Sequence, residues 1–562
     1  MSLTTSAAPP IVRLRTALVV ALIALALFLP GFAGLQPIDR DEPRFAQATK
    51  QMLETGDFVS IRFQDQARNK KPVGIYWAQA AVVSSAEALG LSDARRTIWL
   101  YRIPSLLGAL ATVLLTYWTA LALGSRRMAL VASILVASTV VLGVEARLAK
   151  TDALDAATIM AAIGVLARLW IRREAPAAGR EGLGLAALFW GALAAGILVK
   201  GPVAVMVVGL TALTLSITIR SGRWLLPLRP LWGVLWLLLL VSPWFVLIML
   251  RTKGAFLTDS VGADMLAKVG GGQEAHGAPP GTHLLAMLGT AWPLSPLLLL
   301  SVPFIWAKRR EPAIVFLLAW LIPNWIVFEL VPTKLPHYVL PLFPALALLA
   351  ARAGDQGAWH LHALWRRLLN AAVPGLGAVL LVAAAIACIW TGTAPGWAYY
   401  VALPAFAVLA YQFLQQPDAP ADARALRAAG MAFTAYVAVY AGVLTGPFAR
   451  TFGLSPLLES AVRQGQSTSG CEALETASAG YAEPSLVFLD RTDLQLTDGA
   501  GAAHFLAGGT CRAAIVESRF EGPFRAAAAS DPDVVLVGRV RGYNFNKSSA
   551  MDFGVYVRGR GT

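Results

Sequence analysis

The 562-residue chain has little charge and almost no cysteine. Asp, Glu, Lys and Arg make up 14% of it, whereas a water-soluble domain carries about 25%. Hydrophobic residues reach 57%, so the composition excludes a soluble enzyme. Three cysteines also exclude a disulfide scaffold and a cysteine-rich metal domain.

Several nucleotide-binding and metalloprotease motifs are missing as well. The chain has no Walker A loop, no HExxH motif, and no dinucleotide fingerprint that opens a helix after a strand. ATP-driven and nicotinamide chemistry therefore lose support. The net charge of +14 would suit a nucleic-acid partner, but membrane proteins concentrate Lys and Arg in cytoplasmic loops that face anionic lipid. We expect no nucleic acid.

Long apolar runs are what the chain has in abundance. About 20 apolar residues cross the roughly 30 Å of hydrocarbon in a bilayer, and such runs recur through residues 1–446. They predict a mainly α, polytopic membrane domain with about thirteen transmembrane helices. The predicted spans are 13–34, 103–124, 128–145, 153–171, 183–199, 202–219, 231–250, 284–306, 312–331, 336–351, 368–391, 397–414 and 427–446.

An odd number of spans places the two termini on opposite sides of the membrane. Most Lys and Arg residues of the short loops lie on the N-terminal side, which favours a cytoplasmic N-terminus in a bacterial inner membrane. Two outer loops are long. Loop 35–102 contains an amphipathic stretch at 74–89 that predicts a helix along the interface, and loop 252–283 contains a glycine run typical of a flexible segment.

Residues 447–562 lack apolar spans and predict a small periplasmic α/β domain. Strand-like runs occur at 485–490, 513–518, 533–540 and 553–559. Cys471 and Cys511 fall on this oxidising side, where disulfides persist. A disulfide needs Cα atoms within about 7 Å of each other, so the sequence leaves a bond and two free thiols equally open.

The first outer loop opens with a dense cluster of acidic and basic residues that includes Asp41, Glu42 and Arg44. Its position directly after the first span suggests a functional site. The alternative is a well-capped helix start, because Pro43 suits the first helical turn and acidic residues favour that end of the helix dipole.

The second outer loop carries Asp152 and Asp155 at the start of span 153–171. Ionisable residues near membrane depth usually face a cavity or a partner, although helix capping by Thr151 or Asp152 is the alternative. Topology places Lys71 and Lys200 on the same outer face. Carboxylates can accept a proton and lysines can neutralise phosphate oxygens, so the set suits a phosphate-bearing substrate, although single lysines could simply snorkel to the interface.

An ordered series of motifs resembles the bacterial aminoarabinose (4-amino-4-deoxy-L-arabinose) lipid A transferases, within the protein O-mannosyltransferase-like GT-C glycosyltransferases. The thirteen spans and the periplasmic C-terminal domain also resemble that family. The motifs lie at residues 41–46, 52–58, 71–77, 147–152, 200–202, 268–276 and 334–341.

The resemblance implies an inverting glycosyltransferase that moves a sugar from undecaprenyl phosphate to lipid A at the periplasmic face, a lipopolysaccharide modification linked to polymyxin resistance. Asp41 matches the principal catalytic carboxylate and Asp152 the second. Other matching positions are expected to bind the donor phosphate or the substrate. They are Arg44, Lys71, Tyr76, Lys200, Lys268, His337 and Tyr338.

Two positions depart from the family pattern. Lys268 stands where arginine is usual, which keeps the charge but loses bidentate phosphate contact. Lys70 stands where the close relatives show glutamate, which leaves the identity of the sugar open. No cofactor is expected to be required. The need for a divalent metal stays open. Glu42 and His276 could supply ligands in addition to Asp41 and Asp152, although no spacing specifies a site.

The expected partners are the polyprenyl-phosphate-linked sugar, the lipid A acceptor and membrane lipid, and the chain is expected to act as a monomer. The main alternative is a related transferase that uses another sugar or a protein acceptor. A transporter or flippase is less favoured, because transporters place polar residues midway along broken helices, whereas here most charges lie at span ends.

Overall fold

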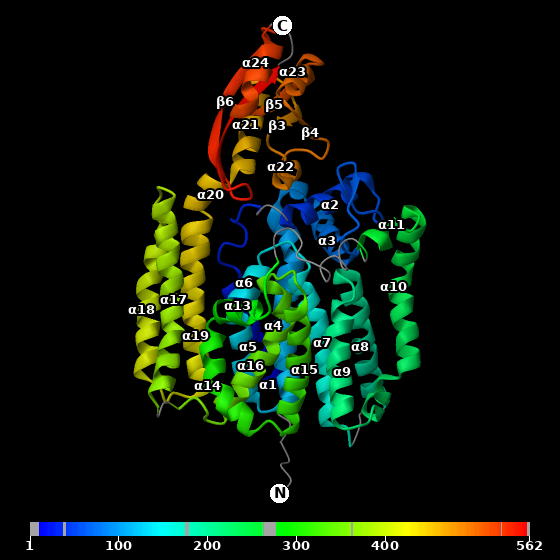
Figure 1. Cartoon of the computed structure of the whole chain (residues 1–562), viewed down its shortest axis with the longest axis vertical. Coiled ribbons are helices and arrows are strands. Elements are labelled where there is room, and N and C mark those ends of the chain that lie inside the picture. The colour runs from blue at the N-terminus through cyan, green and yellow to red at the C-terminus, as the bar shows by residue number, and fades with distance from the viewer. Residues whose placement is uncertain are drawn as a thin grey trace.

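The computed structural model describes residues 10–37, 41–174, 179–260, 262, 277–360, 363–529 and 531–558. Long helices form a bundle, and a smaller domain containing a β-sheet stands on one end of it (Figure 1). The helices α2 and α3 lie between the bundle and this domain (Figure 1).

The described part of the chain contains nine helical segments long and apolar enough to cross a membrane. A tenth span results if the bent pair α13 and α14 is counted as one. The nine are α4 (Ile98–Leu123), α7 (Asp152–Ile171), α8 (Gly179–Lys200), α10 (Pro230–Thr252), α15 (Pro312–Leu330), η4 (Pro336–Leu342) with α16 (Phe343–Asp355), α17 (Leu364–Trp390), α18 (Trp397–Gln415), and α19 (Ala421–Tyr436) continued by η5 (Val437–Leu444) and α20 (Pro447–Phe452).

Every predicted span falls on a helix or on consecutive helices, which confirms the predicted fold class. The predicted spans outside these nine fall on the bent pair α13 (Thr282–Thr290) with α14 (Leu294–Ala307), on α1 (Pro10–Phe28), on α9 (Val203–Thr218), and on α5 (Arg126–Ser138) with α6 (Val140–Glu145). The break between α5 and α6 falls at Thr139, whose extended backbone interrupts the helix.

The helices α4 and α7 lie against each other in the interior of the bundle. Gly108 of α4 permits this approach, because a Cβ atom there would lie 2.7 Å from the backbone of Leu154. By contrast, α10 exposes a row of large apolar side chains such as Leu231, Trp232 and Leu239, which suits contact with lipid. The close α4–α7 packing fixes the position of Asp152, the first residue of α7.

The first outer loop is folded rather than extended. It contains α2 (Asp41–Thr55), a short hairpin of β1 (Arg62–Phe63) and β2 (Gln66–Ala67), α3 (Gly74–Ala88) and the single turn η1 (Ala94–Arg96). The helix predicted at 74–89 is therefore confirmed. Its buried face packs against α2, α4 and α8, so α3 belongs to the protein interior as well as to the surface.

The C-terminal domain is built on a five-stranded mixed sheet of order β4-β3-β5-β7-β6. The strands β3, β4 and β5 are parallel, and β7 pairs antiparallel with both β5 and β6. Its core is separate from that of the helix bundle. The domain boundary predicted after residue 446 lies just before α20. The elements are α21 (Leu454–Ser469), β3 (Glu475–Ala479), α22 (Pro484–Leu489), β4 (Gln495–Thr497), α23 (Gly499–Ala507), β5 (Arg512–Glu517), η6 (Ser518–Phe520), α24 (Glu521–Ala528), β6 (Val534–Asn544) and β7 (Ser549–Arg558).

Three of the four predicted strand runs correspond to β5, β6 and β7, but the strand predicted at 485–490 is wrong. That segment is the helix α22, which Pro484 begins at its first position. Proline is favoured there, and a short buried apolar run cannot be assigned to strand or helix by periodicity alone. The strands β3 and β4 were not predicted, because small and polar residues such as Thr476 and Ser478 dominate them.

The question left open for Cys471 and Cys511 is resolved. The two residues form a disulfide with Cα atoms 5.7 Å apart. It joins the start of the loop between α21 and β3 to the residue before β5, and so ties together the segments that lead into two neighbouring parallel strands. Cys388 is buried in α17 as a free thiol.

Candidate active site

The start of α2 is fastened to α4 by a buried ion pair. The guanidinium of Arg102 donates to both carboxylate oxygens of Glu42, from Nε at 2.7 Å and from Nη2 at 2.9 Å. Glu42 also accepts the backbone N–H of Ala149 at 2.9 Å. The pair therefore brings the first outer loop against the second and leaves the neighbouring Asp41 exposed at the start of α2.

Asp152 lies in a second set of ion pairs at the start of α7. Nζ of Lys200, the last residue of α8, donates to Oδ1 of Asp152 at 2.7 Å. The same Nζ lies 3.8 Å from Oδ2 of Asp155, one turn further along α7. The ring of His337 in η4 completes the set, with Nε2 3.7 Å from Oδ1 of Asp152.

Glu145 and Lys150 extend this set along the second outer loop. Nζ of Lys150 donates to Glu145 at 3.0 Å, and Nδ1 of His337 lies 3.8 Å from the same carboxylate. Burial opposes the charge on Lys150, but Glu145 and Asp152, with a further contribution from Asp41, raise the pKa of its ammonium above its ordinary value. Asp41 thus lies within electrostatic reach of Lys150.

We call these six residues the polar cluster. They come from α6, the second outer loop, α7, α8 and η4, and all are buried or half-buried. Opposite charges offset one another within the cluster, as buried ionisable groups require. Its members are Glu145, Lys150, Asp152, Asp155, Lys200 and His337.

Three further predicted residues lie around the polar cluster. Arg44 is half-buried one turn after Asp41, on the same face of α2. Lys71 lies within electrostatic range of Asp155, and Tyr338 lies within range of Lys200. The structure therefore brings predicted site residues of five separate sequence motifs to one region of the molecule.

Tyr76 is fully buried in α3, with its ring centroid 5.5 Å from that of Phe45. Burial raises the pKa of its hydroxyl, and the nearby Asp41 adds to this effect while Arg68 opposes it. Tyr76 thus lies beneath the start of α2 and supports it. The remaining predicted residues, Lys268 and His276, lie outside the described residues.

A divalent metal has no described ligand set here. Among the described residues, no three His, Cys, Asp or Glu side chains form a group suited to a metal ion. Glu42, which the sequence offered as a donor, uses its oxygens for Arg102 and the Ala149 N–H.

Glu145, Lys150 and Arg102 were absent from the predicted site residues. All three are charged residues at or just inside the ends of apolar helices. Charges at this depth rarely lack a partner or a function, so their position was the available signal. Their contacts could not be predicted from the sequence, because most of the partners are distant in the chain. The exception is the pair of Glu145 and Lys150, which are five residues apart.

The chain is similar to curated aminoarabinose transferases over about three fifths of its length; no family model matches it. It is 30% identical over 351 residues to the undecaprenyl phosphate-alpha-4-amino-4-deoxy-L-arabinose arabinosyl transferase of Pseudomonas paraeruginosa, covering 62% of this chain and 60% of the relative. The enzyme of that name from Aeromonas hydrophila is 30% identical over 342 residues, covering 59% and 60%. The chain thus spans less than two thirds of these relatives.

Solved structures extend the likeness to nearly the whole chain. ArnT from Cupriavidus metallidurans, in a crystal structure bound to undecaprenyl phosphate, superposes with a TM-score of 0.70 at 18% identity and covers 97% of each chain. The archaeal oligosaccharyltransferase AglB from Archaeoglobus fulgidus gives a TM-score of 0.50 at 12% identity, covering 98% of this chain and 74% of AglB.

These comparisons and the apolar helices identify a multi-pass inner-membrane protein. The resemblance to the aminoarabinose transferases is confirmed, in sequence by the curated relatives and in fold by ArnT.

Proposed function

We propose that the chain is an inverting glycosyltransferase that moves 4-amino-4-deoxy-L-arabinose from undecaprenyl phosphate to lipid A at the periplasmic face of the inner membrane. The observation that carries the proposal is the position of Asp41. Its carboxylate is exposed at the start of α2, beside the cations of the polar cluster and of α2 itself. The names of the curated relatives supply the sugar and the carrier.

The topology that goes with this function has a cytoplasmic N-terminus and a periplasmic C-terminal domain. The excess of Lys and Arg in the short loops on the N-terminal side supports it. The helix α2 lies at the end of the bundle nearest the C-terminal domain (Figure 1), and Asp41 at its start lies within electrostatic reach of Lys150 in the polar cluster. A lipid-linked donor and a lipid acceptor can both present their head groups at that level.

Binding of the donor phosphate is assigned to Arg44, Lys71 and Tyr338 among the described residues, together with Lys268. Lys200 has a different part, because its ammonium already binds Asp152 at 2.7 Å. We assign this pair the task of holding η4, through His337 and with it Tyr338, against the start of α7. Cations held in place before the reaction stabilise the charge that collects on the leaving phosphate.

In the reaction, an oxygen of the acceptor attacks the anomeric carbon from the face opposite the phosphate. The bond from the anomeric carbon to the phosphate oxygen breaks, and its electron pair leaves with the undecaprenyl phosphate. One displacement of this kind inverts the anomeric centre. Because the phosphate is already a reasonable leaving group, orientation of the acceptor and stabilisation of charge supply most of the catalysis.

The role of Asp41 depends on the acceptor group. A sugar hydroxyl must lose a proton as it attacks, and Asp41 would then be the general base. A phosphate of lipid A is already ionised and needs no strong base, so Asp41 would instead orient the acceptor or bind the amine of the amino sugar. The resemblance to the aminoarabinose transferases favours the second role.

Lys70 favours a second candidate function, the transfer of a different sugar from the same carrier. It is exposed in the first outer loop, at the position where the resemblance to the aminoarabinose transferases implies glutamate. A lysine there repels an amine that a glutamate would attract. A polyprenyl-phosphate sugar without an amine, with lipid A or a protein as acceptor, is the alternative substrate.

The test is mass spectrometry of lipid A from a strain that lacks its own transferase and expresses this chain or its Asp41→Asn variant. We expect an added mass of one amino-pentose with the parent chain and none with the variant at equal expression. An Asp65→Asn variant, altered at an exposed residue of the β1–β2 hairpin, should modify lipid A normally. Unmodified lipid A in the presence of the donor would refute the proposed acceptor, and a hexose mass would support the second candidate.

A further inference from the structure

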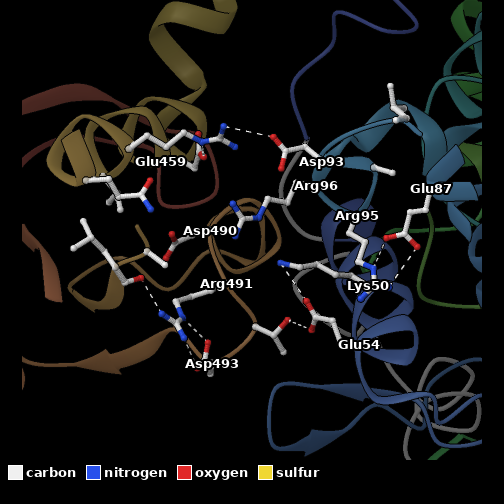
Figure 2. A pocket seen from close by; sticks show the side chains of 18 residues that line it. Lys50, Glu54, Glu87, Asp93, Arg95, Arg96, Glu459, Asp490, Arg491 and Asp493 are labelled. Carbon is white, nitrogen blue, oxygen red and sulfur yellow. Dashed lines mark hydrogen bonds and ion pairs between the residues drawn. The ribbon is translucent and has the colours of Figure 1, made fainter. Parts of the chain in front are cut away.

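A cavity of about 710 Å³ lies between the first outer loop and the C-terminal domain. Its walls come from α2, from the end of α3 through η1, from α21 and the loop after it, and from the residues after α22 (Figure 2). None of the residues assigned above to the transfer reaction lines it. Lys50 in its wall follows Asp41 by nine positions on α2, which corresponds to about 14 Å along the helix axis.

The cavity wall is strongly polar and mixed in charge. Eleven of its eighteen lining residues are ionisable, six acidic and five basic. Most are paired within the wall. Nε of Arg95 donates to Glu87 at 2.6 Å, and Nε of Arg491 donates to Asp493 at 2.5 Å. These pairs hold the wall in place without any ligand.

Lys50 joins the two sides of the cavity. Its ammonium is buried and donates to the carbonyl of Phe488 in α22 at 3.0 Å, while Oε1 of Glu54 lies 4.0 Å away. Close by, Nε2 of Gln47 donates to the Thr492 hydroxyl at 2.8 Å. The C-terminal domain is thus hydrogen-bonded to α2, the helix that begins with Asp41.

Two charged groups in the wall, Arg96 and Asp490, form no ion pair with any described residue. The side chain of Arg96 is exposed and makes no hydrogen bond or ion pair with any described residue. Asp490 lines the cavity and is 8% exposed, and its buried Oδ2 atom has no hydrogen-bond partner in the described part of the chain. Arg96 points from η1 toward Asp490 across the cavity (Figure 2). A guanidinium and a carboxyl group therefore line the same cavity.

The chemistry of this wall selects one class of ligand. A lipid tail would leave Arg96 and Asp490 buried and unsatisfied, which is costly. A polyanion would meet six carboxylates as well as five cations. A saccharide fits both groups, because each hydroxyl donates one hydrogen bond to a carboxylate and accepts others from a guanidinium. The volume also lies within the roughly 300–1,000 Å³ of typical small-ligand sites.

We propose that this cavity is a second saccharide-binding site, which holds sugar residues of the acceptor glycolipid that extend away from the membrane. The proposal rests on the proposed function for the presence of a glycolipid acceptor. Arg96 and Asp490 are its principal hydrogen-bonding residues. Because residues of both α2 and the C-terminal domain line this cavity, the C-terminal domain would take part in selecting the acceptor.

The binding test uses the full-length protein in nanodiscs and a free oligosaccharide released by mild acid from bacterial lipooligosaccharide, which lacks lipid A. Saturation-transfer NMR should detect binding to the parent chain and to Asp41→Asn. Arg96→Ala and Asp490→Asn should each weaken it about tenfold. Because Arg96 is exposed and its side chain forms no hydrogen bond or ion pair with a described residue, its variant should fold like the parent chain.

The matched control is Arg62→Ala, which removes an exposed arginine of the same loop outside the cavity and should bind normally. Binding that is absent from the parent chain, or that survives both cavity variants, would overturn the proposal. Equal displacement of the oligosaccharide by inorganic phosphate would also overturn it, in favour of a general anion site.

A transfer assay separates this proposal from the proposed function. With lipid A alone as acceptor, Arg96→Ala should match the parent chain. With an acceptor that carries further sugars, it should show a raised KM and an unchanged kcat. If the parent chain modifies neither acceptor, the proposed function fails whatever the NMR result. If Arg96→Ala and the parent chain have equal KM values for the acceptor that carries further sugars, the second-site proposal fails.

Discussion

Arg102 and Glu42 form a two-point ion pair in which both side chains are almost completely buried. Arg102 also donates to the carbonyls of Phe32 and Leu35, so a single guanidinium connects α4, the end of the first span and the start of α2. Removal of one partner leaves an uncompensated buried charge. The position of the neighbouring Asp41 thus depends on a residue that does not touch the substrate.

The first prediction concerns this pair. Glu42→Ala should lower the free energy of unfolding by about 3–5 kcal/mol, the range for breaking a buried ion pair, and should reduce transfer because α2 loses its anchor. Thermal unfolding of the protein in detergent measures the stability. Glu87→Ala is the control, because its ion pair with Arg95 is about one third exposed and should contribute less than about 1 kcal/mol. Equal losses in the two variants would contradict the prediction.

The second prediction concerns Asp152 and Lys200. Asp152→Asn and Lys200→Met should each destabilise the protein, because each leaves the other charge buried at the membrane boundary. The double variant should lose less stability than the sum of the single losses, with a coupling of about 0.5–3 kcal/mol. All three variants should lose transfer. Additive stability losses would show that the pair is not coupled.

The third prediction concerns the disulfide of the C-terminal domain. Cys471 and Cys511 are 40 residues apart in sequence, and closing a loop of that length stabilises a domain by about 3–4 kcal/mol. In the double Cys→Ser variant, a protease should therefore begin to cleave the C-terminal domain at a lower temperature than it cleaves the helix bundle. A Cys388→Ala variant should behave like the parent chain. Identical cleavage of all three proteins would refute a stabilising disulfide.

The membrane spans could be predicted because a bilayer leaves the chain few options. About 20 apolar residues must be helical to satisfy their backbone in lipid, and every predicted span lies on one or more helices. The interruptions could not be predicted. The break at Thr139 and the 117° bend between α13 and α14 occur within apolar sequence, where composition is the same on both sides.

The candidate site was predictable in its position but not in its contacts. Topology placed Asp41, Asp152 and Lys200 on one face, as the structure does. The partner of Glu42 is 60 residues away, and no local pattern specifies such a pairing. The helix α22 was mistaken for a strand because its six residues are too few to reveal a period.

The last prediction concerns pH and the cavity wall. Burial raises the pKa of Asp490 to about 6, from 3.8, while the Thr476 hydroxyl and the charges of Arg96, Arg491 and Lys50 pull it down. A carboxyl group with a raised pKa binds its proton more tightly in the folded state. Stability therefore falls as the pH rises from about 4 to about 6, and the full cost, about 3 kcal/mol, persists above that range.

Asp490→Asn carries no charge at any pH and removes this cost. Its melting temperature should equal that of the parent chain near pH 4 and exceed it at pH 7 to 8, by several degrees if the C-terminal domain melts as a unit. Asp65→Asn, at an exposed position, should show no such pH-dependent difference. A stabilisation that is constant across the pH range would mean that Asp490 is not held protonated by burial. A loss of stability at pH 7 would mean that the charge of Asp490 already has a partner in the folded protein. Asp490 would then not serve as the hydrogen-bond acceptor of the saccharide site.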